Sequence, residues 1–491
     1  MIKLIELLGK EKLSLKNQLT ILQINDVHGY LDLHPELYYK NQGIELRTAG
    51  GYSRIKTIVE NIRKENGQVL FLDNGDTLHG TYEAVESEGE SLVPILNNLG
   101  LDAMTFHWDI AYGPDILLKR QEELNYPILA INAYDKDTHE LYTNPYVIKD
   151  IQGIRVGIIG IACNIIDKTM PKKFSEGLYF TNGSDELPKY LKEARENGAE
   201  VTVVLSHLGF PQDVKLIEDT PGIDVVISGH THNRLEQLQK VNDTYIMQSG
   251  SHGSFVGKLT LTLFGSKPVT ATHELIHVEE SIVEDKTMKK LVHKAMEPHI
   301  EKLSKVVGKT EVVLHRGNAL ESPMDNLLLS SMLEETGAEL AFSNGWRYGA
   351  PVPQGDVTLR HLHQIIPVNP PVSTVDITGA ELLAMMEENL ENTYARDPFA
   401  QMGGYVKRCL GLKIYMKIEN EKGRRIQKFY VGDQELDLTK TYKACYVTNQ
   451  GVPNKYGVNH KKTETLAIEA LEKYLKNHSF NKAYHETFVV I

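Results

Sequence analysis

Short apolar runs alternate with amphipathic stretches along roughly the first half of the chain. Runs rich in β-branched and large apolar residues occupy positions 19–26, 68–76, 155–162, 201–209 and 224–232. Between them, segments such as 52–67 and 186–198 carry apolar residues at helical spacing. Buried strands that alternate with amphipathic helices predict an α/β layered domain. Ligand crevices of open α/β sheets lie beyond the carboxyl ends of the strands, so polar residues there are candidates for a site.

The pattern changes after residue 279. Residues 280–306 form a long, charged helical pattern with little strand signal, which indicates a helical connector. From about residue 310, turns rich in glycine and proline, short strands and a helical stretch are mixed. We therefore predict a first domain over residues 1–279, a helical linker over 280–309 and a second α/β domain over 310–491.

Composition narrows the function classes. The 491 residues carry 53 basic and 65 acidic side chains, a net charge of −12, which argues against general nucleic-acid binding but leaves room for a local cationic pocket. The three cysteines, Cys163, Cys409 and Cys445, lie far apart and indicate a reducing compartment. Charges interrupt every apolar run in residues 1–18, and no window of about 18 apolar residues occurs. We expect no export signal, no membrane partner and a cytoplasmic location.

Aspartate and histidine residues follow the strand-like runs of the first domain. They are Asp26, His28, Asp76, His107, His207, His230 and His232. Two carboxylates and five imidazoles exceed what one metal ion takes, whereas two divalent ions bridged by Asp76 would use all of them. This mixture suits zinc, manganese, iron or cobalt better than magnesium or calcium. Such a pair of ions generates hydroxide near neutral pH and clamps both ends of an in-line displacement.

Each histidine also has a structural interpretation. A single histidine at a strand end, such as His207, is more often hydrogen-bonded or packed than a ligand, so it is the joint pattern that favours a site. His79 either starts a helix or faces the substrate, and the same two interpretations apply to His252. His361 and His363 are expected to pack on a helix of the second domain.

At these residues the sequence resembles the calcineurin-like metallophosphoesterases, and more closely the two-domain 5′-nucleotidase and cyclic-nucleotide phosphodiesterase family. That family carries, in order, the motifs D-x-H, G-D, G-N-H-E-x-D, a strand-end histidine and G-H-x-H. All but the third occur here, and the resemblance covers about residues 19–475. It implies a layered β-sandwich flanked by helices, followed by a second α/β substrate-binding domain.

The resemblance assigns the ligands to two ions. One would be held by Asp26, His28, Asp76 and His232. The other would be held by Asp76, His107, His207 and His230. Manganese and zinc are the favoured ions, with iron and cobalt as alternatives. Family members commonly have asparagine where His107 stands. Trp108 replaces a histidine thought to stabilise the leaving group, and Ala111 replaces the aspartate that orients that histidine.

One branch of the family shows the same substitutions. The segment "HWDIAYG" (107–113) looks like the corresponding segment of the periplasmic sulfur-oxidation thiosulfohydrolases, which use two manganese ions, and residues 391–408 resemble that branch too. Those enzymes are exported, whereas no export signal is expected here. The residues leave open whether a small phosphoester or a sulfur analogue is the substrate.

The second domain resembles the part of the family that recognises substrate. The segment "SNGWR" (343–347) looks like an anion-binding turn, in which Arg347 takes the anion in a bidentate fork and Asn344 adds a polar contact. Phe399 and Tyr405 lie near the segment that stacks on the base of a nucleotide. The alternatives are a surface arginine and aromatic side chains that pack on the sheet.

These features predict a dimetal phosphoester hydrolase, resembling a 5′-nucleotidase, in which metal-activated hydroxide attacks a small anionic substrate. Arg347 would stabilise the developing charge, and water, His79 or the substrate itself would protonate the leaving group. We therefore expect slow turnover of unactivated nucleotides. Two alternatives remain: thiosulfohydrolase-like cleavage of a sulfur ester, and a non-catalytic module that binds a metal ion and an anion.

Overall fold

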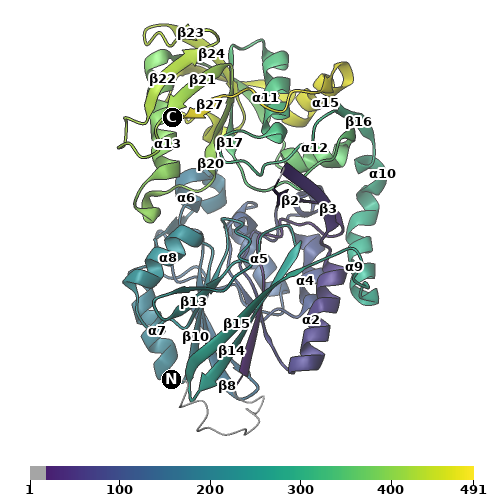
Figure 1. The fold of residues 1–491 in the computed structure, drawn as a ribbon, viewed down its shortest axis with the longest axis vertical. Coiled ribbons are helices and arrows are strands. Elements are labelled where there is room, and N and C mark those ends of the chain that lie inside the picture. Colours follow the sequence, from purple (N-terminus) through teal and green to yellow (C-terminus); the bar gives the residue numbers. More distant parts are fainter. Residues whose placement is uncertain (1–17, 42) are drawn as a thin grey trace.

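The computed structural model describes residues 18–41 and 43–491. The segment on which the expectation about an export signal rests lies almost entirely outside these residues. The chain forms two parts, a lower one in purple to teal and an upper one in green to yellow (Figure 1). Among the described residues, no helix has the length and apolar character needed to cross a bilayer.

Two packed β-sheets form the centre of the first domain. The first has the strand order β15-β14-β1-β4-β5 and the second β12-β13-β11-β10-β8-β7. The first comprises β1 (Gln18–Ile24), β4 (Leu70–Asp73), β5 (Ala103–Met104), β14 (Phe255–Phe264) and β15 (Lys267–His277). The second comprises β7 (Tyr146–Ile151), β8 (Ile154–Ile161), β10 (Val201–Ser206), β11 (Val225–Ser228), β12 (Gln239–Val241) and β13 (Thr244–Met247). Leu19 and Ile21 of β1 share one buried cluster with Val203 and Leu205 of β10, which places this core between the sheets.

Helices cover both outer faces of this sandwich (Figure 1). On one side lie α2 (Tyr52–Asn66), α4 (Val93–Leu99) and α9 (Lys286–Met296), and on the other α7 (Leu187–Glu196) and α8 (Phe210–Asp219). In α2, Ile55, Val59 and Ile62 recur at helical spacing and are buried against Phe71 of β4. The predicted layered β-sandwich flanked by helices is therefore confirmed.

Shorter elements complete the first domain. They are β2 (His34–Lys40), β3 (Gly43–Ala49), α3 (Tyr82–Glu86), α5 (Pro114–Glu123), β6 (Ala133–Asp135), α6 (Ile166–Thr169) and β9 (Leu178–Phe180). The hairpin of β2 and β3 reaches the second domain, where the Tyr39 hydroxyl donates to the carbonyl of Gly317 at 2.7 Å.

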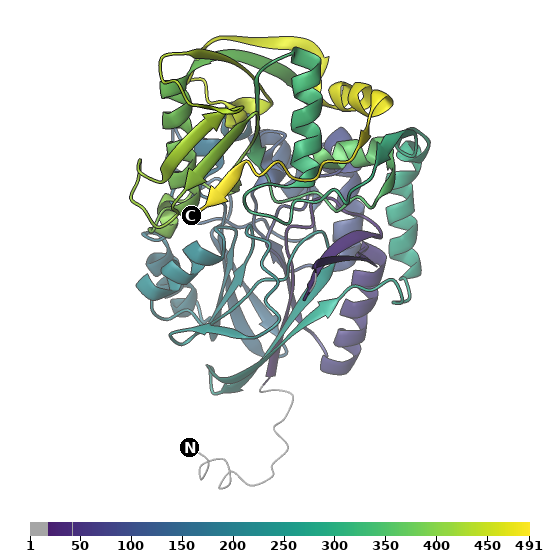
Figure 2. The same ribbon diagram turned by 45° about the horizontal axis from the view of Figure 1, so that its top comes forward.

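The second domain contains the predicted α/β fold. Its central sheet has the order β20-β17-β24-β19-β25, beside a four-stranded sheet β23-β22-β21-β27 and a three-stranded sheet β18-β16-β26. Its strands are β16 (Val306–Thr310), β17 (Leu340–Gly345), β18 (Gly355–Thr358), β19 (Pro371–Thr378), β20 (Tyr405–Leu410), β21 (Leu412–Met416), β22 (Ile426–Val431), β23 (Gln434–Glu435), β24 (Thr441–Tyr446), β25 (Val458–Leu466), β26 (Ser479–Phe480) and β27 (Phe488–Val490). Its helices are α11 (Pro323–Thr336), α12 (Leu359–Ile365), α13 (Gly379–Tyr394), α14 (Thr448–Gly451) and α15 (Ala467–Asn477). Figure 2 shows the last part of the chain, in yellow, crossing this domain and ending in β27, which pairs with β21.

The segment between the domains packs closely on both. Helix α9 contacts α2 and α4 of the first domain, and α10 (Ile300–Leu303) contacts α12 of the second. Strand β16 begins at Val306, inside the predicted linker, and already pairs with β18 and β26. The boundary at residue 310 stays a prediction, but the connector is a packed element rather than an exposed tether.

The strand directions place the candidate site. β1, β4 and β5 are parallel in the first sheet, and β10 and β11 are parallel in the second. The predicted ligands all come shortly after the carboxyl ends of these five strands, so both sheets contribute side chains to one edge of the sandwich. That edge lies under the second domain.

Candidate metal centre and substrate cleft

All seven predicted ligand residues come together in two groups of donor atoms. One group is Asp26, His28, Asp76 and His232. The other is Asp76, His107, His207 and His230. Within each group the donor atoms lie within 4.8 Å of one another, and every residue is buried except His232, which is partly exposed. The grouping matches the two ligand sets expected from the sequence, with Asp76 common to both.

One carboxylate oxygen of Asp76 joins the groups. Its Oδ2 lies 3.2 Å from Nδ1 of His107, 3.3 Å from Nε2 of His207 and 3.6 Å from Nε2 of His28. Three imidazole nitrogens from different strand ends thus converge on a single oxygen. This is the position expected of an atom that bridges two cations.

The ligand residues lie in strained turns beyond the strands. Asp26, His28, Asp76, His230 and His232 all have positive φ, between 51° and 68°. Such left-handed backbone is uncommon for residues other than glycine and costs about 1–3 kcal/mol at each position. The alternation of side chains along a strand therefore does not explain the Asp26–His28 and His230–His232 pairs, because β1 ends at Ile24 and β11 at Ser228. The turns themselves aim both members of each pair inward.

Backbone carbonyls orient two of the imidazoles. Nδ1 of His207 lies 2.5 Å from the carbonyl oxygen of Asn74, and Nδ1 of His28 lies 3.2 Å from that of His79. A carbonyl only accepts, so in both rings Nδ1 carries the hydrogen and Nε2 points to the centre. Nε2 of His207 is buried and has no hydrogen-bond partner among residues 18–41 and 43–491. A cation would satisfy this atom.

Asp109 is a positioning residue that the sequence did not reveal. Its carboxylate accepts hydrogen bonds from the amides of Asp76, Thr77 and Leu78 at 2.8 Å each, and from the amide of His107 at 3.1 Å. One buried side chain therefore fixes the turn of Asp76 and the start of the His107 turn together. The available signal was an aspartate two residues after a candidate ligand.

The protonation states suit cation binding. Burial alone would raise the pKa of Asp76, but the charges of His107 and His207 hold it well below its ordinary value. Burial lowers the pKa of His28 to about 3, so that its lone pair is free at neutral pH. Burial would also lower the pKa of His207, but Asp76 and Asp26 raise it to about 9, so a cation bound there would release this proton. Nitrogen and carboxylate donors of this kind fit two divalent transition-metal ions.

A cleft of about 300 Å³ opens from these ligands into the second domain. Asn344, Arg347 and Tyr405 all line it, and their role in substrate binding stays a prediction. Arg347 donates from Nη2 to the carbonyl of Gly404 at 2.8 Å and lies over the Tyr405 ring, 5.1 Å from its centroid. Phe399 lies elsewhere and packs on the apolar cluster beside α8. Its assignment to substrate stacking stays a prediction that this position does not favour.

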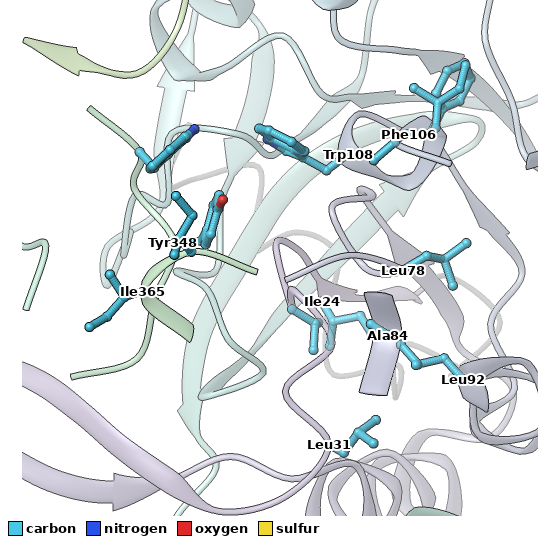
Figure 3. Packing of buried hydrophobic residues seen from close by; sticks show 14 of the residues in the cluster. Ile24, Leu31, Leu78, Ala84, Leu92, Phe106, Trp108, Tyr348 and Ile365 are labelled. Carbon is cyan, nitrogen blue, oxygen red and sulfur yellow. The ribbon is translucent and has the colours of Figure 1, made fainter. Parts of the chain in front are cut away.

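Trp108 forms part of the cleft wall beside the ligands. Its amide donates to Oδ1 of Asp76 at 2.6 Å, and its ring meets Tyr348 of the second domain edge-on at 5.9 Å (Figure 3). His79 lies behind it, stacked on the indole at 4.9 Å, and both of its ring nitrogens are buried without a hydrogen-bond partner in the described part of the chain. His79 is not among the residues that line the cleft. Its role as proton donor stays a prediction, which the position of Trp108 between His79 and the cleft does not favour.

A buried ionic network anchors the turn that carries Arg347. The Asp325 carboxylate accepts hydrogen bonds from Nε of Arg316 at 2.9 Å and from Nε of Arg408 at 3.0 Å. All three side chains are buried. Arg316 also donates to the carbonyl of Tyr348 at 2.9 Å. No local sequence pattern predicts this network, because its members lie far apart along the chain.

The remaining candidate histidines have structural partners. Nδ1 of His252 lies 3.3 Å from Glu36, and its Nε2 accepts the amide of Gly349 at 3.3 Å, which joins the two domains. His361 closes the capping box of α12, and His363 meets the edge of Tyr82 at 4.6 Å. His252 does not line the cleft.

Two protein-family models match the chain. The model for calcineurin-like phosphoesterases covers residues 19–234, and the model for the 5′-nucleotidase C-terminal domain covers residues 304–451. A 5′-nucleotidase of Vibrio parahaemolyticus is 23% identical over 94% of this chain and 90% of its own. A trifunctional nucleotide phosphoesterase of Bacillus subtilis is 22% identical over 87% of this chain, which spans only 31% of that longer protein.

Two solved structures share the fold over nearly the whole chain. The sulfate thiohydrolase SoxB of Thermus thermophilus superposes with a TM-score of 0.89, at 23% identity over 96% of both chains. A 5′-nucleotidase precursor of the same organism superposes with a TM-score of 0.84, at 23% identity over 96% of this chain and 99% of its own. The fold and site define a two-domain metallophosphoesterase. The first domain matches the calcineurin-like phosphoesterases and the second matches the C-terminal domain of the 5′-nucleotidases, which confirms the resemblance expected from the sequence.

Proposed function

We propose that this protein hydrolyses small phosphoesters, including nucleotide-like substrates, at a site that holds two divalent metal ions. One observation carries the proposal: seven donor residues form two groups that share Asp76, at the base of a cleft lined by Arg347. The nucleotidases and nucleotide phosphoesterases among the relatives support the substrate class. We further propose manganese or zinc as the ions, because the ligands combine imidazoles with carboxylates.

We assign the residues of the site to metal binding and to phosphoryl binding. Asp26, His28, Asp76 and His232 would hold one ion, and Asp76, His107, His207 and His230 the other. Bound there, the ions would supply Lewis acidity and a water acidic enough to react near neutral pH. Arg347 presents a guanidinium to a phosphoryl group, and its hydrogen bond to Gly404 fixes the direction of the fork.

The cleft wall also determines which leaving groups depart easily. Trp108 stands where a proton donor to the leaving oxygen would be needed. An indole N–H donates hydrogen bonds but does not ionise in the physiological pH range, so it cannot serve as the general acid. The leaving group must therefore depart with much of its negative charge. Esters of acidic alcohols and phenols should react far faster than esters of ribose.

We predict a steep dependence of rate on the acidity of the leaving group. In the presence of Mn²⁺, kcat/KM should be at least ~10²-fold higher for p-nitrophenyl phosphate than for AMP, the range typical of general acid catalysis. A series of substituted phenyl phosphates with released phosphate as readout measures the slope. Comparable kcat/KM values for AMP and p-nitrophenyl phosphate would show that a proton donor has been overlooked.

A second candidate function is cleavage of a sulfur ester, with the same ligands and cleft. The His107–Trp108 pair favours it, because that pair separates this chain from the family's usual motif. A panel of phosphoesters, cyclic nucleotides and thiosulfonates, assayed separately for phosphate and sulfate, distinguishes the two functions. Phosphate release alone supports the first proposal, and sulfate release alone supports the second.

We also propose a cytoplasmic setting. Cys163, Cys409 and Cys445 are all free thiols buried in the fold, which suits a reducing compartment. Fractionation of the native host with an antibody to the chain tests this directly.

A further inference from the structure

A lysine lines the cleft in the second domain, on the same strand as Tyr405. Lys407 lies two residues after Tyr405 in β20, so both side chains project from the same face of the strand. Lys407 is only 4% exposed, yet it is among the residues that line the cleft. Two residues of a strand span about 7 Å, which sets the distance of Lys407 from the Tyr405–Arg347 pair along the wall.

The ammonium of Lys407 is incompletely satisfied. Among the residues that the structure describes, it donates one hydrogen bond, to the carbonyl oxygen of Gln450, although an ammonium has three donors. Glu388, the carboxylate that influences it, is already bound by Lys455 at 2.6 Å and by the Tyr456 hydroxyl at 2.5 Å. Within the described part of the chain, no carboxylate forms an ion pair with Lys407. A buried charge in this state is costly unless a ligand completes its shell.

The surrounding wall suits an anion better than a neutral ring. Asn389, Asn392 and Gln450, three residues with neutral amide side chains, are among the residues that line the cleft with Lys407. Lys455, with 59% of its side chain exposed, also lines the cleft, so two lysines there face the single carboxylate of Glu388. Burial lowers the pKa of Lys407 to about 8, which leaves it mainly protonated at neutral pH. A neutral base placed here would leave the ammonium unpaired.

We propose that Lys407 binds a second anionic group of the substrate, a phosphate or carboxylate beyond the ester that is hydrolysed. The inference rests on the proposed function, because it takes the ligand end of the cleft as the place of the scissile phosphoryl group. The preferred substrates are then small molecules with two negatively charged groups, one near Arg347 and one near Lys407. Lys407 acts as a specificity-determining residue.

Paired substrates test this preference by turnover. In the wild type, kcat/KM should be ~10–100-fold higher for 3-phosphoglycerate than for glycerol 1-phosphate, or for adenosine 3′,5′-bisphosphate than for AMP, as expected for hydrogen bonds between charged groups. The first pair differs by a carboxylate and the second by a phosphate, so the two pairs show which of these anionic groups Lys407 prefers. Lys407→Met should abolish the preference while the rates on the singly charged members stay within ~3-fold, and Lys407→Arg should retain part of it. Lys413→Met, on β21, the next strand along the chain, and outside the cleft, is the matched control.

A binding measurement makes the inference independent of turnover. Calorimetry with Mn²⁺ present compares 3-phosphonopropionate and methylenediphosphonate, which carry two anionic groups, with propylphosphonate, which carries one. At least ~10-fold tighter binding of either dianionic ligand, lost in Lys407→Met and kept in Lys413→Met, supports the inference even if no ester is hydrolysed. Hydrolysis without any preference, with equal affinity for the phosphonates, overturns it and leaves the proposed function standing. Lys407→Met slowing every substrate equally would instead identify a structural contact to Gln450.

Discussion

Replacing Asp76 by asparagine will remove phosphoesterase activity and one or both metal ions. Oδ2 of Asp76 lies within 3.6 Å of nitrogens of His28, His107 and His207, so this single oxygen contacts ligands of both groups. The substitution keeps the shape of the side chain but loses its charge. We expect kcat/KM on p-nitrophenyl phosphate to fall by at least ~10³-fold, the upper range for losing one electrostatic group in an active site.

The measurement pairs metal analysis with kinetics on the same protein samples. Asp219→Asn is the matched control, because Asp219 lies on the surface at the end of α8, where it pairs with Lys215. The control should keep its metal content and rate. If Asp76→Asn binds metal and turns over like the control, Asp76 does not bridge the ions.

Replacing Asp325 by alanine will have the largest effect on the stability of the second domain. Asp325 is the only carboxylate bound by Arg316 and Arg408 among the described residues, and all three side chains are at least 97% buried. Its removal leaves two guanidinium groups in the interior without a counter-ion. Breaking a buried pair in this way costs about 3–5 kcal/mol.

Urea unfolding, followed by circular dichroism, measures this loss of free energy. Asp356→Ala in the same domain is the control, since its partner Lys309 is exposed and 3.8 Å away. We also expect weaker substrate binding in Asp325→Ala, because Arg316 holds the carbonyl of Tyr348 next to Arg347. A loss of stability no larger than in the control would mean that the two arginines are stabilised by their carbonyl contacts alone.

Most residues of the candidate metal centre could be predicted from the sequence, for a physical reason. Metal ligands must be aspartate or histidine, and this fold places them directly after its parallel strands, so strand-like runs followed by D-x-H or G-H-x-H mark them. The alternation of side chains along a strand does not account for the Asp26–His28 and His230–His232 pairs. The paired residues lie in left-handed turns beyond the strands, and a strained backbone of this kind has no signature in residue type apart from nearby glycine.

The rest of the site depends on contacts between distant segments. Asp109 acts through backbone amides of residues 76–78, and Asp325 acts through arginines from β20 and from the loop before α11. Lys407 becomes a candidate for substrate binding only once the structure shows that it is buried beside the cleft and donates to the Gln450 carbonyl. The same limit explains Phe399, whose sequence position near Tyr405 does not bring it to the cleft. Tertiary packing, rather than local pattern, decides such cases.

The interpretation of Trp108 needs both the sequence and the structure. Its identity distinguishes this chain from the usual family motif, and its position between His79 and the cleft shows what the substitution does. Under the proposed function, Trp108 places an apolar wall where the resemblance implies a proton donor, while its amide holds Asp76 in place. We therefore expect the ligand geometry to be maintained and the demand on the substrate's leaving group to change.

The most direct test of the account is a metal titration of the chelator-treated protein, with phosphate release measured at each step. The account predicts that two Mn²⁺ or Zn²⁺ ions bind per chain, and that hydrolysis of p-nitrophenyl phosphate rises with occupancy of the second ion. Full activity in the chelated protein, or saturation of both binding and rate at a single ion, would contradict it.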